Sequence, residues 1–125
     1  MADPAESAKK RILIADDEPS VLYCLRRVLG NRHNLIEAKD GQQAVVLAKE
    51  HRPDVIIMDM MMPVKDGLTA CSEIRSNPLT SAIPIVMLTG VGYELNEKLA
   101  GAVGATRYVT KPFSPQELLN TIGSL

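Results

Sequence analysis

The chain has 125 residues, of which 46% are hydrophobic and 23% are charged, and its formal net charge is −1. This length suits one domain with a single core, and the composition is too apolar for a disordered chain. A net charge near zero gives no electrostatic reason to expect nucleic acid or an anionic membrane as a partner. No apolar run reaches the length of a membrane span, and the first residues do not form a signal peptide. We therefore expect a cytosolic protein that binds neither nucleic acid nor membrane.

Short apolar runs punctuate the sequence and predict its strands. Residues 1–10 are small, polar and without periodicity, so we interpret them as a flexible tail ahead of a domain that spans residues 11–125. Continuous apolar runs are typical of parallel strands that are buried on both faces. We expect such strands at residues 12–15, 35–38, 55–59, 83–88 and 106–110.

The stretches between these strands carry helix signals. Pro19 suits a first helical turn, Asp40 can cap the helix that follows it, and Asp66-Gly67 opens the next helix. We expect helices that begin at Pro19, after Asp40, after Asp66, at Tyr93 and at Pro115. Strands that alternate with helices over short connections indicate a doubly wound α/β fold with right-handed crossovers. The fold predicted is a five-stranded parallel sheet in the flavodoxin-like order 2-1-3-4-5, with helices on both faces.

Polar side chains close four of the predicted strands. Asp16 and Asp17 follow the first strand, Asp59 closes the third, Thr89 follows the fourth and Lys111 follows the fifth. Parallel strands bring their carboxyl ends to one edge of the sheet, which is where ligands bind. Three carboxylates, a hydroxyl and an ammonium are therefore expected to meet there.

This set of groups suits phosphoryl transfer assisted by a metal ion. Three carboxylates close together repel one another, and hard oxygen ligands without histidine or cysteine favour Mg²⁺. Lys111 and Thr89 can contact phosphate oxygens, and an ionised Asp59 can accept a phosphoryl group directly. One aspartate alone would be interpreted as a helix cap or a surface ion pair, but the whole set at strand ends favours a functional site.

Several short motifs follow one another in a distinctive order. They are Asp16-Asp17-Glu18, Asp59 followed by Met62-Pro63 and Asp66-Gly67, Thr89-Gly90, Gly104-Ala105 before Tyr108, and Lys111-Pro112-Phe113. On these motifs the chain, from about residue 11 to about residue 122, resembles a receiver domain of the two-component response-regulator family. Gly90 and Arg107 depart from the residues that are common in the family, and both departures bear on partner choice rather than on the chemistry.

The resemblance implies a phosphoacceptor and a metal site. Asp59 would accept the phosphoryl group, Asp17 would bind Mg²⁺ directly, and Asp16 would bind it through water. The backbone carbonyl of Met61 would complete the ligands that the protein supplies.

The resemblance also implies a switch. Thr89 and Tyr108 would form the switch pair, and Lys111 would contact the phosphoryl group. A cis peptide bond is implied between Lys111 and Pro112, which would turn the lysine toward the site.

The partners implied by the resemblance are proteins. A histidine kinase or a histidine phosphotransfer protein would donate the phosphoryl group from a phosphohistidine. An output domain or a partner protein would bind the surface formed by residues 93–101, 106–110 and 115–122. The chain's own enzymatic activity would be limited to its phosphorylation and the hydrolysis of the product.

Three other functions compete with this interpretation. Aspartate-nucleophile phosphatases carry a second acid two residues after the nucleophile, where this chain has Met61. A phosphorylation-independent scaffold would not need the complete set of acids, hydroxyl and lysine. A flavin carrier would need hydroxyls and amides after the first strand, because acids there repel a phosphate.

The residues two positions after Asp59 and Thr89 are Met61 and Val91. Both are apolar and unable to orient an attacking water, so we predict slow hydrolysis of the phosphoryl group. The neighbouring methionines, Met58, Met60 and Met62, are interpreted together with Met61 as apolar filling of the strand and loop rather than as a soft-metal site.

Overall fold

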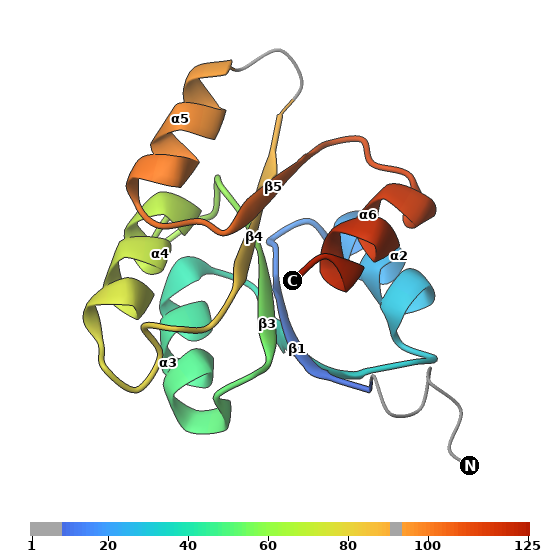
Figure 1. Cartoon of the computed structure of the whole chain (residues 1–125), viewed down its shortest axis with the longest axis horizontal. Helices are drawn as coiled ribbons and strands as arrows, with labels where there is room; N and C mark the ends of the chain where they lie inside the picture. The colour runs from blue at the N-terminus through green and yellow to red at the C-terminus, as the bar shows by residue number, and fades with distance from the viewer. Residues whose placement is uncertain (1–8, 91–93) are drawn as a thin grey trace.

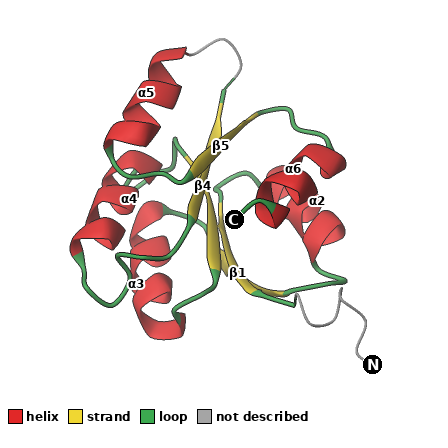
Figure 2. Cartoon of the chain, in the orientation of Figure 1, coloured by secondary structure: helices red, strands yellow, loops and turns green. Residues whose placement is uncertain are grey.

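The computed structural model describes residues 9–90 and 94–125 and shows a five-stranded parallel sheet with helices on both faces (Figure 1, Figure 2). The strand order is β2-β1-β3-β4-β5, which confirms the predicted flavodoxin-like order. Most of the predicted tail (residues 1–8), Val91 and Tyr93 lie outside the described residues. Among those that are described, no helix is both long and apolar enough to cross a bilayer.

Strands and helices alternate along the described chain, as the sequence predicts. The strands are β1 (Arg11–Ala15), β2 (Asn34–Ala38), β3 (Val55–Asp59), β4 (Ile85–Thr89) and β5 (Arg107–Thr110). The helices are α2 (Pro19–Leu29), α3 (Gly41–His51), α4 (Gly67–Ser76), α5 (Glu94–Ala102) and α6 (Pro115–Gly123).

β4 begins two residues later than the apolar run indicates. Pro84 has no N–H to donate to a neighbouring strand. The carbonyl of Ile83 accepts a 2.6 Å hydrogen bond from Nη1 of Arg75, which projects from α4. The regular ladder therefore starts at Ile85.

Side-chain caps set the first residue of three helices. The carboxylate of Asp40 accepts a 2.8 Å hydrogen bond from the N–H of Gln43, and the carboxylate of Asp66 accepts a 2.7 Å bond from the N–H of Thr69. The predicted cap at Asp40 is thus confirmed, Asp66 caps the helix that it was expected to open, and Ser114 caps α6 in the same way. Such caps contribute about 1 kcal/mol each, and here they fix the lengths of the loops that leave the carboxyl edge of the sheet.

The core forms two layers because successive side chains of a strand point to opposite faces of the sheet. In β3, Ile56 and Met58 pack in the layer under α3, α4 and α5, whereas Val55 and Ile57 pack under α2 and α6 (Figure 1). Burial on both faces explains why these strands have continuous rather than alternating apolar sequences.

The loop from β3 to α4 returns very close to the end of β3. The N–H of Gly67 donates a 2.8 Å hydrogen bond to the carbonyl of Met60. A Cβ atom at Gly67 would lie 2.1 Å from the carbonyl oxygen of Asp59, a distance that no side chain tolerates. Glycine at this position therefore allows the helix to start directly behind Asp59.

Alanine substitutions at two glycines test this close approach. We expect Gly67→Ala to destabilise the protein by about 2 kcal/mol or more, because backbone at the end of β3 must move. Gly101→Ala in α5 is the control, since a Cβ there meets nothing within 4 Å and should stabilise the helix by up to about 1 kcal/mol. Urea unfolding of both variants measures the difference, and equal effects would contradict the packing described here.

Candidate functional site

The carboxyl ends of the strands bring the predicted site residues to one edge of the sheet. The parallel pairing places Ala15 beside Met58, and Asp59 beside Leu88. Asp16 and Asp17 therefore follow β1 at the level where β3 ends with Asp59. β4 and β5 bring Thr89 and Lys111 to the same edge, because Thr89 pairs with Thr110, the residue before Lys111.

Three carboxylates converge at this edge. Asp16, Asp17 and Asp59 each offer one oxygen atom, and these oxygens all lie within 4.8 Å of one another. Asp16 is fully buried, Asp59 is 7% exposed, and Asp17 lies on the surface. The group is thus closed on the side of Asp16 and open to solvent on the side of Asp17.

The ammonium group of Lys111 lies among these acids. Its Nζ is 2.9 Å from Oδ2 of Asp16, 3.3 Å from Oδ1 of Asp59 and 3.6 Å from Oε1 of Glu18. The N–H of Lys111 donates a 2.7 Å hydrogen bond to the carbonyl of Thr89, which fixes the backbone at this point. The peptide bond before Pro112 is cis, as the sequence predicts.

Glu18 is a site residue for which no role is predicted from the sequence. Besides its contact with Lys111, its N–H donates a 2.9 Å hydrogen bond to Oδ1 of Asp16. The available signal was the third consecutive acid after the first strand, but only the fold shows that it faces a lysine far along the chain.

Two of the carboxylates, those of Asp16 and Asp59, hold protons more tightly than isolated carboxylates do. Burial raises the pKa of Asp59 to about 6, and the charge of Asp16 adds to this, against the opposing effects of Lys111 and the N–H of Met61. Burial also raises the pKa of Asp16, despite the hydrogen bond from Glu18 and the contact with Lys111. For Lys111, burial lowers the pKa, but the hydrogen bond with Asp16 and the charge of Asp59 outweigh burial and raise it overall. The site therefore has more negative charge than its one lysine compensates.

Thr89 contributes a hydroxyl that has no hydrogen-bond partner. Its Oγ1 is buried, and it is the one such side-chain atom without a partner among the described residues. An unsatisfied buried hydroxyl costs about 1–3 kcal/mol, so its presence at a strand end favours a role in contacting a ligand.

Tyr108 lies on the same face of the sheet as Thr89. Tyr108 pairs with Met87, two residues before Thr89, and side chains two residues apart point the same way. The ring is 50% exposed, while Thr89 is 1% exposed. The two predicted switch residues are therefore neighbours, one at the surface and one inside.

The methionines around Asp59 differ from one another. Met58 and Met60 are 0% and 3% exposed and fill the core, as the sequence predicts. The interpretation as apolar filling is wrong for Met61, whose side chain is 73% exposed because the chain has left the strand there. Its backbone N–H lowers the pKa of the Asp59 carboxyl, so the residue borders the acceptor. The metal ligand predicted at its carbonyl stays a prediction.

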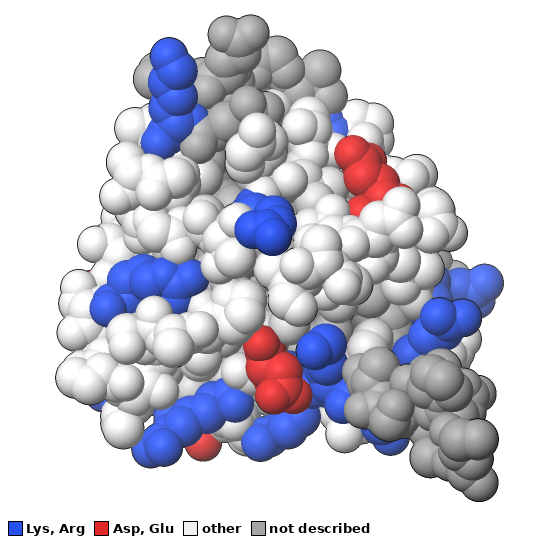
Figure 3. All heavy atoms as spheres, viewed as in Figure 1, with Lys and Arg blue, Asp and Glu red and all other residues white. Residues whose placement is uncertain are grey.

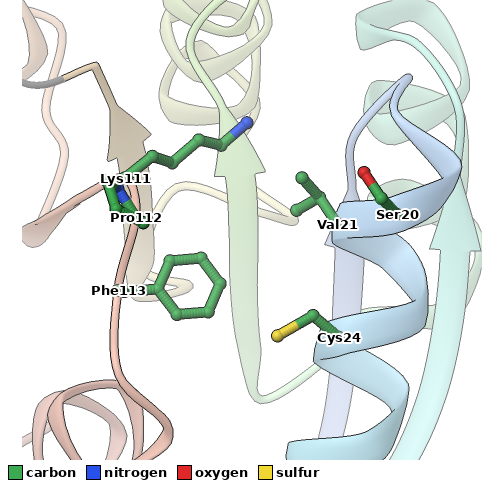
Figure 4. A pocket seen from close by; sticks show the side chains of 6 residues that line it. All are labelled: Ser20, Val21, Cys24, Lys111, Pro112 and Phe113. Atoms are coloured by element: carbon green, nitrogen blue, oxygen red, sulfur yellow. The ribbon is translucent and has the colours of Figure 1, made fainter.

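A cavity of about 320 Å³ lies beside the site, between α2 and the segment that follows β5 (Figure 4). In Figure 4 the ring of Phe113 and the thiol of Cys24 point toward one another, and the Lys111 side chain extends away from them. The residues that line the cavity are Ser20, Val21, Cys24, Lys111, Pro112 and Phe113. The sequence gives no signal for this cavity, because two segments far apart in the chain form it.

The residues present fit a hard divalent cation. The three aspartates supply oxygen ligands only, and the exposed side leaves room for the water molecules that Mg²⁺ retains. The excess negative charge described above would be reduced by such an ion.

Comparisons with known proteins agree with this geometry. The family model of the response regulator receiver domain matches residues 12–123. PilH of Pseudomonas aeruginosa is 36% identical over 116 residues, which cover 92% of this chain and 96% of PilH. The alkaline phosphatase synthesis transcriptional regulatory protein PhoP of Bacillus subtilis is 39% identical over 110 residues, which cover 87% of this chain and 45% of PhoP. The chain spans about half the length of the curated transcriptional regulators that it matches, whereas it covers nearly all of PilH.

A solved structure adds an observation about the metal. The receiver domain of the sensor histidine kinase PA1611 from Pseudomonas aeruginosa superposes with a TM-score of 0.82 at 32% identity, over 94% of this chain and 97% of that domain. That structure has a magnesium ion coordinated in its active-site cleft.

The raised pKa of Asp59 predicts how stability depends on pH. The folded protein binds a proton at Asp59 up to about pH 6, while an unfolded chain releases it near the ordinary value of about 3.9. Stability without divalent metal should therefore fall as the pH rises from about 4 to about 6, by an amount on the order of 1–3 kcal/mol. We expect Asp59→Asn to lose less stability over this range, as measured by urea unfolding in a chelator. A parallel fall in both proteins would contradict the raised pKa.

Mg²⁺ should reverse this destabilisation at neutral pH. Because the three carboxylates come together only in the folded state, saturating Mg²⁺ should raise the free energy of unfolding by about 1–3 kcal/mol and increase the melting temperature. Asp17→Ala should remove most of the increase, whereas Asp54→Asn, at the opposite edge of the sheet, should keep it. Thermal melts with matched ionic strength make the comparison, and a wild-type protein that does not respond would rule out the metal site.

Proposed function

The chain belongs to the response regulator receiver domain family, and we propose that it accepts a phosphoryl group from a phosphohistidine onto Asp59. The observation that best supports Asp59 is its contact with an ammonium at the edge of the sheet where an unpartnered hydroxyl also lies. Lys111 Nζ lies 3.3 Å from its carboxylate, and Thr89, whose buried Oγ1 has no partner, ends the neighbouring strand. Both groups can donate hydrogen bonds to phosphoryl oxygens.

The transfer exchanges one bond to phosphorus for another. An oxygen of the Asp59 carboxylate attacks phosphorus, the bond from phosphorus to the imidazole nitrogen breaks, and that nitrogen keeps the electron pair. The imidazole takes up one proton from solvent, so the products are an acyl phosphate on Asp59 and a neutral imidazole on the donor. In this chain Lys111 would follow the new charge by exchanging its contact with Asp59 for one with a phosphoryl oxygen.

Asp16, Asp17 and the carbonyl of Met61 are the residues we propose to hold Mg²⁺ together with Asp59. The ion, when bound, supplies positive charge that reduces repulsion between the carboxylates and the incoming phosphoryl oxygens. Asp16 keeps its contact with Lys111 at 2.9 Å, which is consistent with a ligand that acts through water.

The hydroxyl of Thr89 connects the acceptor to the surface. Once a phosphoryl group is present, Thr89 would donate to one of its oxygens, and this would favour a conformation in which Tyr108 moves from its half-exposed position toward Thr89. The surface that changes would be that of α5, β5 and α6, which corresponds to the predicted output face. Arg107 is exposed on this surface and would help to select the partner.

We propose proteins as the partners of this domain in the cytosol. The donor would be a histidine kinase or a histidine phosphotransfer protein, and the receiver of the signal would be an output domain or a separate protein. Figure 3 shows the face of the molecule seen in Figure 1, where Lys and Arg side chains lie in separate groups with acidic side chains among them. This mixed pattern supports the expectation that the domain does not bind nucleic acid directly.

The phosphoacceptor can be tested by removing one oxygen. Wild type incubated with Mg²⁺ and acetyl phosphate should gain an acid-labile phosphoryl group that maps to Asp59 by mass spectrometry. We expect Asp59→Asn to lose this incorporation by about a hundredfold or more, because an amide is a poor nucleophile. Asp54→Asn, which alters an exposed acid at the other end of the same strand, is the matched control and should incorporate phosphate normally. Incorporation by Asp59→Asn at the wild-type level would disprove the assignment.

The lifetime of the phosphoryl group should depend on Met61 and Val91. Their apolar side chains cannot orient a water for attack, so we expect wild type to dephosphorylate slowly. Asn at Met61 together with Glu at Val91 should shorten the lifetime about tenfold, since polar groups there can bind the attacking water. Decay of the acyl phosphate after removal of the donor provides the measurement, with the Mg²⁺-dependent melt as a check on the site. A lifetime that did not change would show that the backbone, and not these side chains, controls hydrolysis.

A further inference from the structure

The methionines in the described part of the chain differ in exposure. The sequence contains 6 methionines, and all but Met1 lie among the described residues. Met58, Met60 and Met87 are 0%, 3% and 0% exposed, and Met62 is partly buried against the core. Met61 is 73% exposed and lies two residues after Asp59. An oxidant in solution therefore reaches the sulfur of Met61 far more readily than those in the core.

We propose that Met61 is an oxidation site through which peroxide shortens the lifetime of the phosphoryl group on Asp59. The selectivity for Met61 follows from exposure alone, whereas the effect on lifetime rests on the proposed function. The chemical class of the modifying agent is a hydroperoxide, with hydrogen peroxide as the simplest member.

The reaction is a transfer of one oxygen atom. A lone pair of the thioether sulfur attacks one peroxide oxygen, the O–O bond breaks, and the departing hydroxide takes up a proton and becomes water. Sulfur loses two electrons and peroxide gains them, so the products are methionine sulfoxide and water. The modification converts a flexible apolar side chain into a polar one.

The position of Met61 gives this change a consequence for the acceptor. Met61 lies two residues after Asp59, and its backbone N–H lies close enough to lower the pKa of that carboxyl. The backbone just before Met61 is fixed by two hydrogen bonds of Met60, whose N–H donates to the carbonyl of Leu88 (3.1 Å) and whose carbonyl accepts from the N–H of Gly67 (2.8 Å). Oxidation therefore alters the side chain without requiring the loop to move.

The sulfoxide oxygen would act on the water near the acyl phosphate. A thioether accepts hydrogen bonds weakly, whereas a sulfoxide oxygen accepts them well. We expect water held by that oxygen to lie near the acceptor, because Met61 is two residues from Asp59 and the site is open to solvent on the side of Asp17. The oxidised protein should therefore hydrolyse its phosphoryl group faster than the reduced one.

The two cysteines, which peroxide can also oxidise, differ in exposure. Cys24 is half-buried in the cavity beside Lys111, and peroxide can also reach its thiol. Cys71 is buried, and its thiol donates to the carbonyl of Val103. Dithiothreitol reverses sulfenic acid and disulfide on cysteine but leaves methionine sulfoxide in place, so the two effects can be separated.

The experiment treats the full chain with hydrogen peroxide and then with dithiothreitol, and follows each methionine by peptide mass spectrometry. We expect Met61 to be oxidised at least about tenfold faster than Met58, Met60 and Met87. The protein oxidised at Met61 is then phosphorylated with acetyl phosphate, and its acyl phosphate should decay several-fold faster than that of untreated protein. Met61→Gln, which places a polar oxygen at a similar distance from the backbone, should decay faster than wild type without any peroxide.

Met61→Leu is the matched control, because leucine resembles methionine in size and cannot be oxidised. Its lifetime should be the same before and after peroxide. Oxidation of the core methionines as fast as Met61, an unchanged lifetime in protein fully oxidised at Met61, or an equal acceleration in Met61→Leu would each overturn the proposal. Untreated protein that takes up no phosphate would instead overturn the proposed function and the lifetime effect with it, while the oxidation map would still decide the selectivity of Met61.

Discussion

The excess of negative charge at the carboxyl edge of the sheet governs the chemistry of this protein. Asp16 and Asp59 are almost completely removed from water and share the ammonium of Lys111, while the exposed Asp17 adds a third carboxylate beside them. Charges buried in this way destabilise a fold unless they are paired, so the rest of the molecule must hold them in place. The apolar strands below the site do so, since each carboxylate follows a strand whose level in the sheet is fixed by pairing with its neighbours. The same imbalance favours a bound cation, while Lys111 and Thr89 are the groups that could donate to a phosphoryl group.

The functional side chains at this edge of the sheet belong to two different layers of the core. Alternation along β3 places Asp59 on the side of Val55 and Ile57, under α2 and α6. Alternation along β4 places Thr89 on the side of Met87, which is the layer under α3, α4 and α5. A group bound to Asp59 and to Thr89 would therefore contact both layers at once. This arrangement gives a physical route from a local change of charge to the surface of α5 and β5, because packed layers adjust in discrete steps.

Local signals explain how much of the fold and of the site the sequence could predict. Apolar runs buried on both faces, and the caps at Asp40 and Asp66, depend on residues that are close in the chain, and they located the elements correctly. The convergence of polar strand ends then follows from the parallel topology. Contacts between distant segments were not predictable: Arg75 shortens β4 by bonding to Ile83, and the cavity beside Lys111 joins two segments at opposite ends of the chain. The exposure of Met61 belongs to the same class, because it depends on the path of the loop.

That loop is held firmly, which bears on what its side chains can control. Val64 has a φ of 69° and is 83% exposed, an unfavourable conformation for a β-branched residue that costs on the order of 1–3 kcal/mol. Surrounding contacts impose it: the N–H of Gly41 donates to the carbonyl of Lys65 (3.0 Å), and the Lys65 side chain is paired with Glu73 on α4. A loop fixed at both ends and strained in the middle has little freedom to move its backbone. Within this loop, we therefore expect the chemistry of the exposed Met61 side chain to affect the access of water to Asp59 more than motion of the backbone does.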